Sequence, residues 1–363
     1  MAHVLVSPLN WGLGHATRDM PLIRKLREKG HDVTIAACGN ARAALEQEFP
    51  DCTSLDFPDY PTPYSNSRFF LPKFVLFLPL MLKAFAEERR RIQKIADEHQ
   101  FDLIISDNRL GVFSDKVPSI FITHQLHYHL PFAAWPFELA AVQLNGYLYS
   151  KYDRVIVPDN PPGPNALAGK LSRADTEAIR SRAYYAGILT STQKQDVTED
   201  LDYLVLISGP EPQRTQLEKI LLPKVQELEG SSVVLLGSPN GASRTTTSGR
   251  CRTISYATTE EKQELMNRAK CIICRSGYTS MMELAELKKQ HALFIPTPGQ
   301  TEQEYLSWYY RKQGWFPSTS QYRPDLLATL ETAGSYTGFP AMPDTGTNVA
   351  RLYDELLAGY LEC

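Results

Sequence analysis

The sequence has few cysteines, no long apolar run and almost no excess of charge. Six cysteines in 363 residues are too few for the dense disulfide framework of a small secreted domain, so we interpret them as reduced thiols. No stretch reaches the roughly 18 uncharged apolar residues of a membrane-spanning helix. The 38 basic and 41 acidic residues give a net charge of -3, without the basic field of a nucleic-acid-binding protein. These absences favour an intracellular, cytoplasmic protein with no nucleic-acid partner.

Three local patterns have ordinary interpretations. Cys271 and Cys274 are spaced like a metal or redox pair, but they lie in an apolar run without a second pair, which indicates buried packing. Residues 3–7 predict a strand and are followed at once by polar and glycine residues, unlike a signal peptide. Prolines and lysines interrupt the apolar stretch Phe69–Phe85, so we expect a buried or interfacial segment there.

The length and the 43% hydrophobic content predict about two globular domains. Short apolar runs alternate with helical patterns, which is typical of α/β domains with doubly wound parallel sheets. In the first half we expect a helix over 17–29, ending at Gly30, and these strands: 3–7, 32–37, 102–106, 119–123 and 154–157. In the second half the expected strands are 203–207, 232–236, 251–254, 271–274 and 292–295. The expected domains are 1–188 and 203–363, joined by a polar linker at 189–202, and the Gly- and Ser-rich segment Ser238–Gly249 is expected to be a loop.

The first predicted strand leads into a glycine-rich turn, Asn10–Arg18. Gly12 and Gly14 suit a tight turn, but the third glycine of a dinucleotide fingerprint is missing, so a Rossmann dehydrogenase is not favoured. His15 falls at the start of the following helix, where the helix dipole disfavours the imidazolium and keeps a base neutral. We therefore interpret His15 as a candidate general base; the alternative is a residue that caps the turn.

Two other strands of the first half end in polar residues. Ligands of open α/β sheets bind at the carboxyl ends of the strands, which selects Asp107 and Asn108 after one strand and His124 and Gln125 after another. Asp107 is suited to orient or charge-stabilise a histidine base, and His124 and Gln125 are suited to hold an acceptor. A loop cap or a buried hydrogen bond explains each of these residues equally well.

The second half carries a sharper pattern after the strand 271–274. Arg275 is followed by Ser276 and Gly277, and either Ser276 or Thr279 is expected to cap the next helix. Gly277 lets a ligand approach the free amides, which makes an anion site. Glu283 lies four residues beyond Thr279, about 6 Å further along the same helix face, where it is suited to bind a ribose. The pattern fits a nucleoside diphosphate; the alternative is an ordinary surface glutamate.

Two more turns of the second half are candidates for binding the same ligand. In the loop before the next helix, Gln300, Glu302 and Gln303 are placed to meet sugar hydroxyls. The turn Ser208–Gly209 enters a helix that carries Arg214, and its amides and that guanidinium are suited to neutralise a diphosphate.

These patterns together resemble a known family. Gly12–Arg18 resembles the Gly-x-Gly-His-x-x-Arg opening of GT-B glycosyltransferases such as the peptidoglycan UDP-GlcNAc transferase (MurG-like) family. Arg275–Glu283 resembles the donor motif of that family, and Pro296–Gln303 its sugar-contacting loop. The order of these motifs agrees from residue 3 to about residue 315. Ser208–Gly209 stands where the family has a fuller glycine-rich diphosphate loop.

The resemblance implies two Rossmann-like domains that face a cleft, with a final helix that is a candidate to pack back on the first domain. It implies an inverting, metal-independent hexosyltransferase that uses a nucleotide-sugar, such as a UDP-sugar, as co-substrate and needs no other cofactor. His15, with Asp107, takes the role of base, Glu283 binds the ribose and Gln303 the sugar. Tyr256 and Ala257 fall where the nucleobase packs, and the acceptor side comprises Gly14, Asn108, His124 and Gln125. Glu302 replaces a histidine of the family, so the donor sugar stays open.

Several alternatives remain at this point. A nucleotide-sugar hydrolase shares the opening motif, a related fold hosts UDP-sugar epimerases, and a non-catalytic nucleotide-sugar-binding protein keeps the same pattern. Asp200 and Asp202 match a metal dyad of other glycosyltransferases but lie in the predicted linker. Phe69–Phe85, followed by the arginines of Glu87–Arg91, suits a peripheral contact at the inner face of a membrane and a lipid-linked acceptor of a cell-envelope glycan. The alternative is a helix packed over the first sheet.

Overall fold

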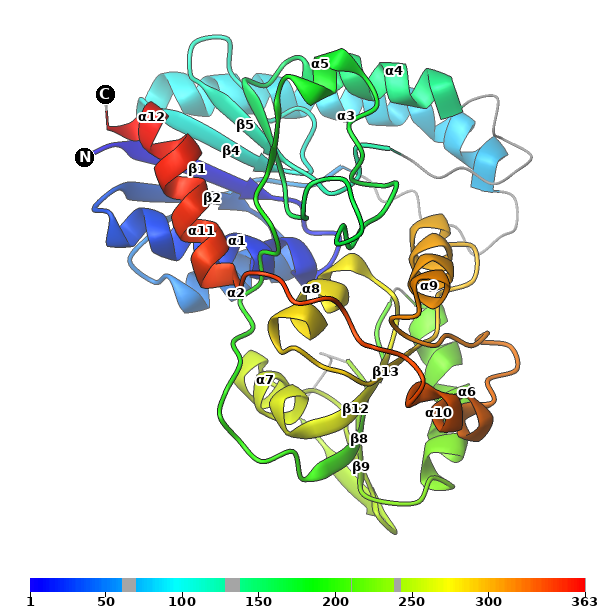
Figure 1. The fold of residues 1–363 in the computed structure, drawn as a ribbon. Helices are drawn as coiled ribbons and strands as arrows, with labels where there is room; N and C mark the ends of the chain where they lie inside the picture. Colours follow the sequence, from blue (N-terminus) through cyan, green and yellow to red (C-terminus); the bar gives the residue numbers. More distant parts are fainter. Residues whose placement is uncertain (61–69, 128–137, 210, 238–242, 363) are drawn as a thin grey trace. The chain divides into compact units, whose positions relative to one another are not determined.

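The computed structural model describes residues 1–60, 70–127, 138–209, 211–237 and 243–362. The chain divides into two compact units, one of Met1–Ser191 with Pro343–Cys363 and the other of Thr192–Met342. Each unit has a mainly parallel sheet with helices packed on it (Figure 1), which confirms the predicted fold class.

The first unit is built on a parallel sheet in the order β3-β2-β1-β4-β5-β6-β7. Its strands are β1 (His3–Pro8), β2 (Asp32–Ala37), β3 (Thr53–Asp56), β4 (Leu103–Asp107), β5 (Ser119–Ile122), β6 (Arg154–Val157) and β7 (Ala183–Tyr185). Its helices are α1 (Leu13–Glu28), α2 (Gly39–Glu48), α3 (Phe70–His99), α4 (Glu138–Tyr149), α5 (Glu177–Arg180), α11 (Thr345–Leu352), the π-helix η2 (Tyr353–Leu357) and α12 (Ala358–Leu361). The short strands β3 and β7 have too few apolar residues to stand out in the sequence.

The strand order of this sheet reverses between β1 and β4, which lie side by side. Pro8, the last residue of β1, is the register partner of Asp107, the last residue of β4. The chain therefore leaves both strands at the same point of the carboxyl edge. Such a switch point is where ligands bind in open α/β sheets.

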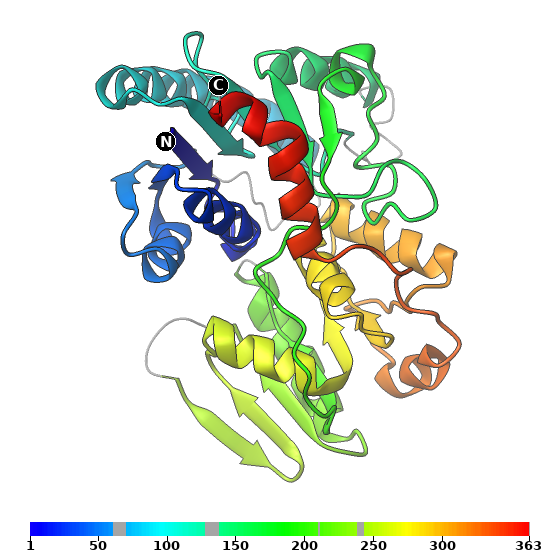
Figure 2. The same ribbon diagram turned by 60° about the vertical axis from the view of Figure 1, so that its left-hand side comes forward.

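The C-terminal segment belongs to the core of the first unit. Leu352, Tyr353 and Leu357 are buried in one apolar cluster with Leu22 and Ile23 of α1. In Figure 2 this segment lies along the first unit, and the Tyr353 hydroxyl lies 2.6 Å from Nε2 of His31. Burial of these leucines, at about 25 cal/mol per Å² of apolar surface, holds the end of the chain on the unit that contains its beginning.

The second unit repeats the architecture with the order β10-β11-β9-β8-β12-β13. Its strands are β8 (Leu201–Leu206), β9 (Ser232–Leu235), β10 (Thr245–Ser248), β11 (Cys251–Ile254), β12 (Ala269–Cys274) and β13 (Ala292–Phe294), and its helices are α6 (Gln213–Gln226), α7 (Thr259–Arg268), α8 (Tyr278–Glu286), α9 (Thr301–Gln313) and α10 (Leu326–Ala333). All the pairings are parallel except that of β10 with β11. The order of this sheet reverses between β8 and β12, so its carboxyl-edge loops at that point include Ser208 and Arg275.

The segment Ser238–Gly249 departs from the predicted loop. Thr245–Ser248 forms the exposed edge strand β10, which pairs antiparallel with β11, while residues 238–242 lie outside the described residues. Three consecutive threonines have high β propensity, and this outweighs the glycine and serine content on which the loop prediction rested.

The Cys-x-x-Cys pair is structural, as predicted. Cys271 and Cys274 are free, buried residues of β12. Burial raises the pKa of the Cys271 thiol to about 12 and that of Cys274 further still. Both thiols are therefore protonated and unreactive at neutral pH.

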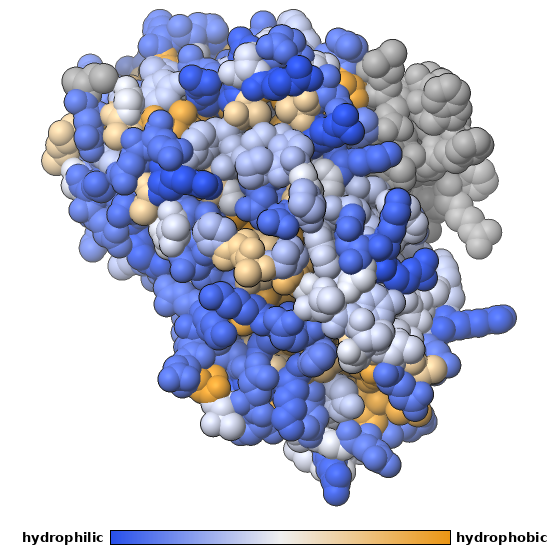
Figure 3. All heavy atoms as spheres, in the orientation of Figure 1, coloured by the Kyte–Doolittle hydropathy of each residue, from blue (hydrophilic) through white to orange (hydrophobic). Residues whose placement is uncertain are grey.

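The apolar stretch Phe69–Phe85 falls largely on α3, which begins at Phe70, but its side chains up to residue 79 lie outside the described residues. Beyond them, Leu80 and Leu82 are exposed. Among the described residues, no helix has both the length and the apolar character to cross a bilayer. Figure 3 shows a face that is mostly hydrophilic, with apolar residues in scattered patches.

The packing of the C-terminal segment gives a first prediction. Leu352→Ala should lower the free energy of unfolding by about 2–5 kcal/mol, because it opens a cavity at a fully buried position. Leu327→Ala, at a leucine that is 54% exposed, is the matched control and should cost well under about 1 kcal/mol. Urea titrations followed by circular dichroism measure both values. Equal costs would show that the C-terminal segment is not part of the core.

Candidate functional site

The start of α1 differs from the prediction and places His15 inside the helix. The helix begins at Leu13 rather than at residue 17, because Gly12 adopts φ 126° and ψ 161°, a conformation that favours glycine, and ends the preceding turn there. No side chain caps this helix start. His15 and Arg18 are three residues apart on α1 and therefore share one face of it.

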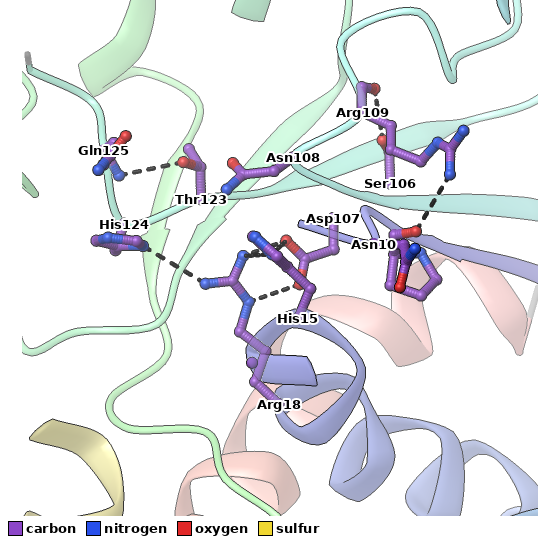
Figure 4. Close-up of polar contacts among 12 residues, drawn as sticks. Asn10, His15, Arg18, Ser106, Asp107, Asn108, Arg109, Thr123, His124 and Gln125 are labelled. Atoms are coloured by element: carbon purple, nitrogen blue, oxygen red, sulfur yellow. Dashed lines mark hydrogen bonds and ion pairs between the residues drawn. The ribbon is translucent and has the colours of Figure 1, made fainter. Parts of the chain in front are cut away.

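That face meets the last residue of β4. Nδ1 of His15 lies 2.9 Å from Oδ1 of Asp107, and Nε of Arg18 donates to Oδ2 at 2.6 Å. Nη2 of Arg18 donates to the other oxygen, Oδ1, so the guanidinium binds the carboxylate at both ends. Figure 4 shows the three side chains pointing toward one another. The sequence predicts the histidine–aspartate pair, whereas the role of Arg18 follows only from the structure.

The charge state of Asp107 follows from these contacts. Its side chain is fully buried, and burial alone would raise its pKa. Arg18 and His15 outweigh that effect and hold the pKa of Asp107 far below its ordinary value. Asp107 is therefore a carboxylate at neutral pH. Nη2 of Arg18 also lies 2.9 Å from Nδ1 of His15, but the guanidinium has both Asp107 oxygens as acceptors. We therefore assign the His15 tautomer with the proton on Nδ1, where it is donated to the carboxylate.

The predicted acceptor-side residues lie around this pair. Gly14 is in the first turn of α1, and Nδ1 of His124 lies 3.5 Å from Nη1 of Arg18. Asn108 follows β4 in the left-handed conformation, with φ 56°, and its carbonyl accepts from the Tyr60 hydroxyl at 2.6 Å. Gln125 is half-buried, and its backbone amide donates to Thr123 Oγ1 at 3.1 Å. Structural hydrogen bonds thus occupy backbone groups of both Asn108 and Gln125.

A buried residue that the sequence analysis missed lies beside the pair. Asp19 is fully buried on α1, and neither of its carboxyl oxygens has a donor in the part of the chain that the structure describes. The carboxyl group does lie within hydrogen-bonding reach of Asp107. Burial raises the pKa of Asp19 well above its usual value, and the neighbouring charge of Asp107 raises it further. The only sign of Asp19 in the sequence is its position four residues after His15, about one turn further along the predicted helix.

In the second unit, Arg275 is held at the carboxyl edge of the sheet. Its Nη1 donates to the carbonyls of Ile295 and Pro296 at 3.0 and 3.1 Å, and its Nη2 donates to the carbonyl of Gln213 at 3.3 Å. The side chain is buried, and burial lowers its pKa to about 10, so it keeps its charge at neutral pH. The carbonyl groups that accept from Arg275 do not cancel its charge, and its buried Nε has no partner among the described residues. A positive potential therefore remains at this edge.

The segment just before α8 is hydrogen-bonded to the first turn of α9. The N-cap of α8 is Gly277, without a capping side chain, so the predicted cap at Ser276 or Thr279 is wrong. The Ser276 hydroxyl instead donates to the carbonyl of Gln303 at 2.8 Å, because it points toward α9. The Gln303 amide oxygen accepts from the backbone of Thr297 at 2.9 Å. The first amides of α8 therefore remain available to an anion, and a glycine at the cap leaves room for it.

Glu283 is buried one turn further along α8 from Thr279. Nζ of Lys262, on α7, donates to both of its carboxylate oxygens, at 2.7 and 2.9 Å. The glutamate is thus not the surface residue of the alternative interpretation. Sequence spacing gave no sign of Lys262, because it comes from another helix.

The predicted diphosphate turn is less open than its sequence suggests. Gly209 has φ 116°, and Ser208 and Gly209 are exposed after β8. Arg214, however, donates to Glu211 at 2.6 Å and to Glu218 at 2.9 Å. Two carboxylates therefore compensate its charge, so a diphosphate would have to compete with them.

The remaining candidates of the second unit lie around the same edge. Tyr256 is 41% exposed after β11, next to the partly buried Ala257. Gln300 is the N-cap residue of α9, and Glu302 lies in the first turn of that helix. Asp200 and Asp202 lie instead at the start of β8, at the opposite edge, and form ion pairs with Arg268 and Lys270 respectively. The described residues contain no group of three side chains with metal-ligand geometry.

Comparisons with known proteins agree with this architecture. Residues 20–161 match a family model described as Glycosyltransferase Family 4. The spinosyn rhamnosyltransferase SpnG, which has also been solved in complex with thymidine diphosphate, is 14% identical with a TM-score of 0.63 over 98% of this chain and 96% of that chain. The chain has the GT-B glycosyltransferase fold. MurG of Acinetobacter baumannii is 15% identical with a TM-score of 0.58 over 98% of this chain and 100% of that chain.

The GT-B fold alone does not single out one relative or one reaction. A putative UDP-N-acetylglucosamine 2-epimerase from Listeria monocytogenes is 11% identical with a TM-score of 0.58, over 100% of this chain and 97% of that chain. Its TM-score equals that of MurG, so the resemblance to the MurG-like family is one among several to GT-B proteins. No curated protein matches the sequence. The function must therefore be inferred from the residues at the carboxyl edges of the two sheets.

The buried Asp19 gives a second prediction. Its pKa is raised in the folded state, so folding favours the protonated acid: that stabilisation is present below the unfolded pKa and is lost as the pH rises through the folded pKa. Asp19→Asn cannot lose a proton. Its melting temperature relative to wild type should therefore rise between pH 5 and pH 8 by at least about 2 °C, the shift that 1 kcal/mol gives a unit of this size.

The control for this experiment is Asp51→Asn, at an exposed aspartate, which should show no such trend. Differential scanning calorimetry across the pH range measures both variants. A melting temperature of Asp19→Asn that falls below wild type equally at every pH would mean that the fold needs the Asp19 carboxylate itself.

Proposed function

We propose that the protein is a glycosyltransferase that moves a sugar from a nucleotide-sugar, with UDP as the preferred nucleotide, to an acceptor hydroxyl. The observation that carries the proposal is the pairing of His15 with the buried carboxylate of Asp107 at the switch point of the first sheet. A histidine oriented by a carboxylate is the arrangement of a general base. The fold and the family match over residues 20–161 support the same class of reaction.

His15 is suited to take the proton of the acceptor. Its Nδ1 faces Asp107, and its Nε2 has no hydrogen-bond partner among the described residues. The side chain is 17% exposed, so Nε2 is within reach of a ligand. As Nε2 accepts the proton, the acceptor oxygen attacks the anomeric carbon and forms the new C–O bond. The bond from that carbon to the diphosphate oxygen breaks, the nucleoside diphosphate leaves with the electron pair, and the configuration is inverted.

The second unit is suited to receive the negative charge of the leaving diphosphate. The start of α8 has no capping side chain and no acidic residue in its first turn, and Arg275 adds a buried positive charge at the same edge. A helix N-terminus and a cation stabilise a departing anion by fixed electrostatics. These groups support a transfer that proceeds without a metal ion.

Glu283 is the proposed ribose ligand, and the structure adds Lys262 to its surroundings. Oε1 accepts from the Lys262 ammonium group and, at 3.5 Å, from the Thr192 hydroxyl, whereas Oε2 accepts, among the described residues, only from the ammonium group and keeps a lone pair for a ribose hydroxyl. Lys262 also compensates the electrostatic cost of burying the Glu283 carboxylate. Gln303, beside Gly277, is the proposed sugar contact.

The acceptor that we propose is lipid-linked. Leu80 and Leu82 expose apolar side chains on α3, and Arg90 and Arg91 are exposed further along the same helix. Apolar and basic residues in this combination suit the surface of an anionic membrane. On this proposal the enzyme works at the inner face of a membrane, on a precursor of a cell-envelope glycan.

The donor site gives a third prediction. In a thermal-shift screen of UDP, GDP, dTDP and CMP with their sugars, one UDP-sugar should raise the melting temperature by several degrees, because binding stabilises the folded state. Glu283→Gln should abolish most of that shift through loss of the ribose contacts. Glu264→Gln, at a partly exposed glutamate of α7, should keep it. If no nucleotide shifts the melting temperature of wild type, the proposed donor site is wrong.

The base gives a fourth prediction. His15→Ala should lower kcat about 10²–10⁴-fold, the usual contribution of a general base, and leave the UDP-induced thermal shift unchanged. Asp107→Asn should also lower kcat, because an amide does not select the same tautomer of His15. His291→Gln, at an exposed histidine, is the control. UDP release is measured with and without acceptors.

The same assay separates the possible reactions. UDP release that needs an acceptor supports transfer, whereas equal release in water alone would identify a hydrolase. UDP binding without any release would identify a binding protein. An unchanged kcat in His15→Ala would exclude His15 as the base.

A further inference from the structure

A pocket of about 270 Å³ lies in the second unit, beside the donor residues. One wall is a face of α9 that carries Glu304, Ser307, Trp308 and Arg311, spaced so that they point the same way. The opposite wall is the segment 318–322, and the loop after β13 closes one end. The donor residues Arg275, Gly277, Glu283 and Gln303 do not line it, although the Ser307 hydroxyl donates to Ser276 at 2.9 Å.

The walls of this pocket are fixed by the fold. Ser318 forms a parallel bridge with Phe294 of β13, and the amide of Thr319 donates to the carbonyl of Phe294 at 2.9 Å. On α9, Leu306 and Tyr310 are fully buried. The segment 318–322 is therefore anchored to the sheet and α9 to the core, so the pocket is formed before any ligand arrives.

Two polar groups that line the pocket have no hydrogen-bond or ion-pair partner among the described residues. Gln321 is 2% exposed, and its Oε1 makes no hydrogen bond within the described residues. The guanidinium of Arg311 is exposed and makes no ion pair or hydrogen bond with any described residue. A buried acceptor without a donor raises the free energy of the folded state. A guanidinium without an ion pair is able to bind a carboxylate or a phosphate through two parallel N–H bonds.

Aromatic rings flank these polar groups. Trp308 is 46% exposed and Tyr322 70% exposed, both unusual for such large side chains. Nζ of Lys312 lies 5.1 Å from the centre of the Trp308 ring and adds a second positive charge beside Arg311. The acidic residue of the pocket, Glu304, accepts from the Gly299 amide at 2.9 Å. Exposed aromatic faces with a few polar groups suit the apolar face of a sugar ring.

We propose that this pocket binds a carboxylate-bearing sugar unit of an acidic glycan. Arg311 takes the carboxylate through paired N–H bonds, with Lys312 adding to the attraction, because a planar guanidinium matches a carboxylate. Gln321 Oε1 accepts from a sugar hydroxyl, and Trp308 and Tyr322 pack on the ring. The proposal goes beyond the transfer reaction: the pocket binds a glycan whether or not the protein transfers sugar.

The test is a titration of the full-length protein with trigalacturonic acid, followed by isothermal titration calorimetry and by saturation-transfer NMR. Wild type should bind with a Kd of about 1 mM or tighter, typical of a small site. Maltotriose, which has no carboxylate, should bind at least about tenfold more weakly, and Arg311→Gln should lose the same factor for the acidic sugar. Trp308→Ala should weaken both sugars, because each ring packs on the indole.

The matched control is Arg323→Gln, which removes an exposed arginine two residues beyond Gln321 and outside the pocket, and it should bind like wild type. A far-UV circular dichroism spectrum and a melting temperature like those of wild type show that Arg311→Gln and Trp308→Ala are folded. Because neither readout involves UDP, this test and that of the proposed function can fail independently.

Four results would overturn the proposal. The first is no saturation transfer from trigalacturonic acid at about 10 mM, far above the expected Kd. The second is equal affinity for maltotriose, which would remove the carboxylate from the recognition. The third is equal loss in Arg311→Gln and Arg323→Gln, and the fourth is equally tight binding of inorganic phosphate; both would reduce the effect to general charge.

Discussion

The buried carboxylate of Asp107 organises the first unit around its candidate site. It ends β4 at the switch point, and Arg18 binds it at both oxygens while His15 lies 2.9 Å away. A carboxylate without these partners would be too costly to bury, and an arginine at that depth would be too costly without the carboxylate. Sheet end, helix start and base are thus joined by one ion pair. Asp19 is affected by the same arrangement, because burial and then the charge of Asp107 raise its pKa and favour its protonated form.

Much of the fold is visible in the sequence, for a physical reason. Strands buried on both faces are short apolar runs, and the runs at residues 3–7, 119–123 and 154–157 correspond closely to β1, β5 and β6. The signal fails where burial is slight. The exposed β10 and the partly buried β3 and β7 carry no such run, and the start of α1 depends on one backbone conformation at Gly12.

In the candidate site, too, some contacts can be predicted from the sequence and others cannot. Residues that follow adjacent parallel strands meet because the topology brings them together. The approach of His15 to Asp107, and of the loop after β12 to the loop after β13, is therefore accessible to sequence reasoning. Partners that arrive from another helix are not: Lys262 on Glu283 and the carbonyl bonds of Arg275 depend on tertiary packing. The cap at α8 failed for a similar reason, since the Ser276 hydroxyl has a better acceptor in α9 than in its own helix.

Because the last helices pack on the first unit, the two units are completed in an unusual order during synthesis. The first unit is discontinuous: Leu352 and Leu357 complete a core that also holds Leu22 and Ile23, while the second unit occupies one uninterrupted stretch. During synthesis on the ribosome, the second unit has all its residues while the first still lacks its closing helix. The order of completion is therefore the reverse of the usual one, in which the N-terminal unit finishes first. Until the final residues emerge, the apolar surface of α1 stays uncovered and open to chaperones.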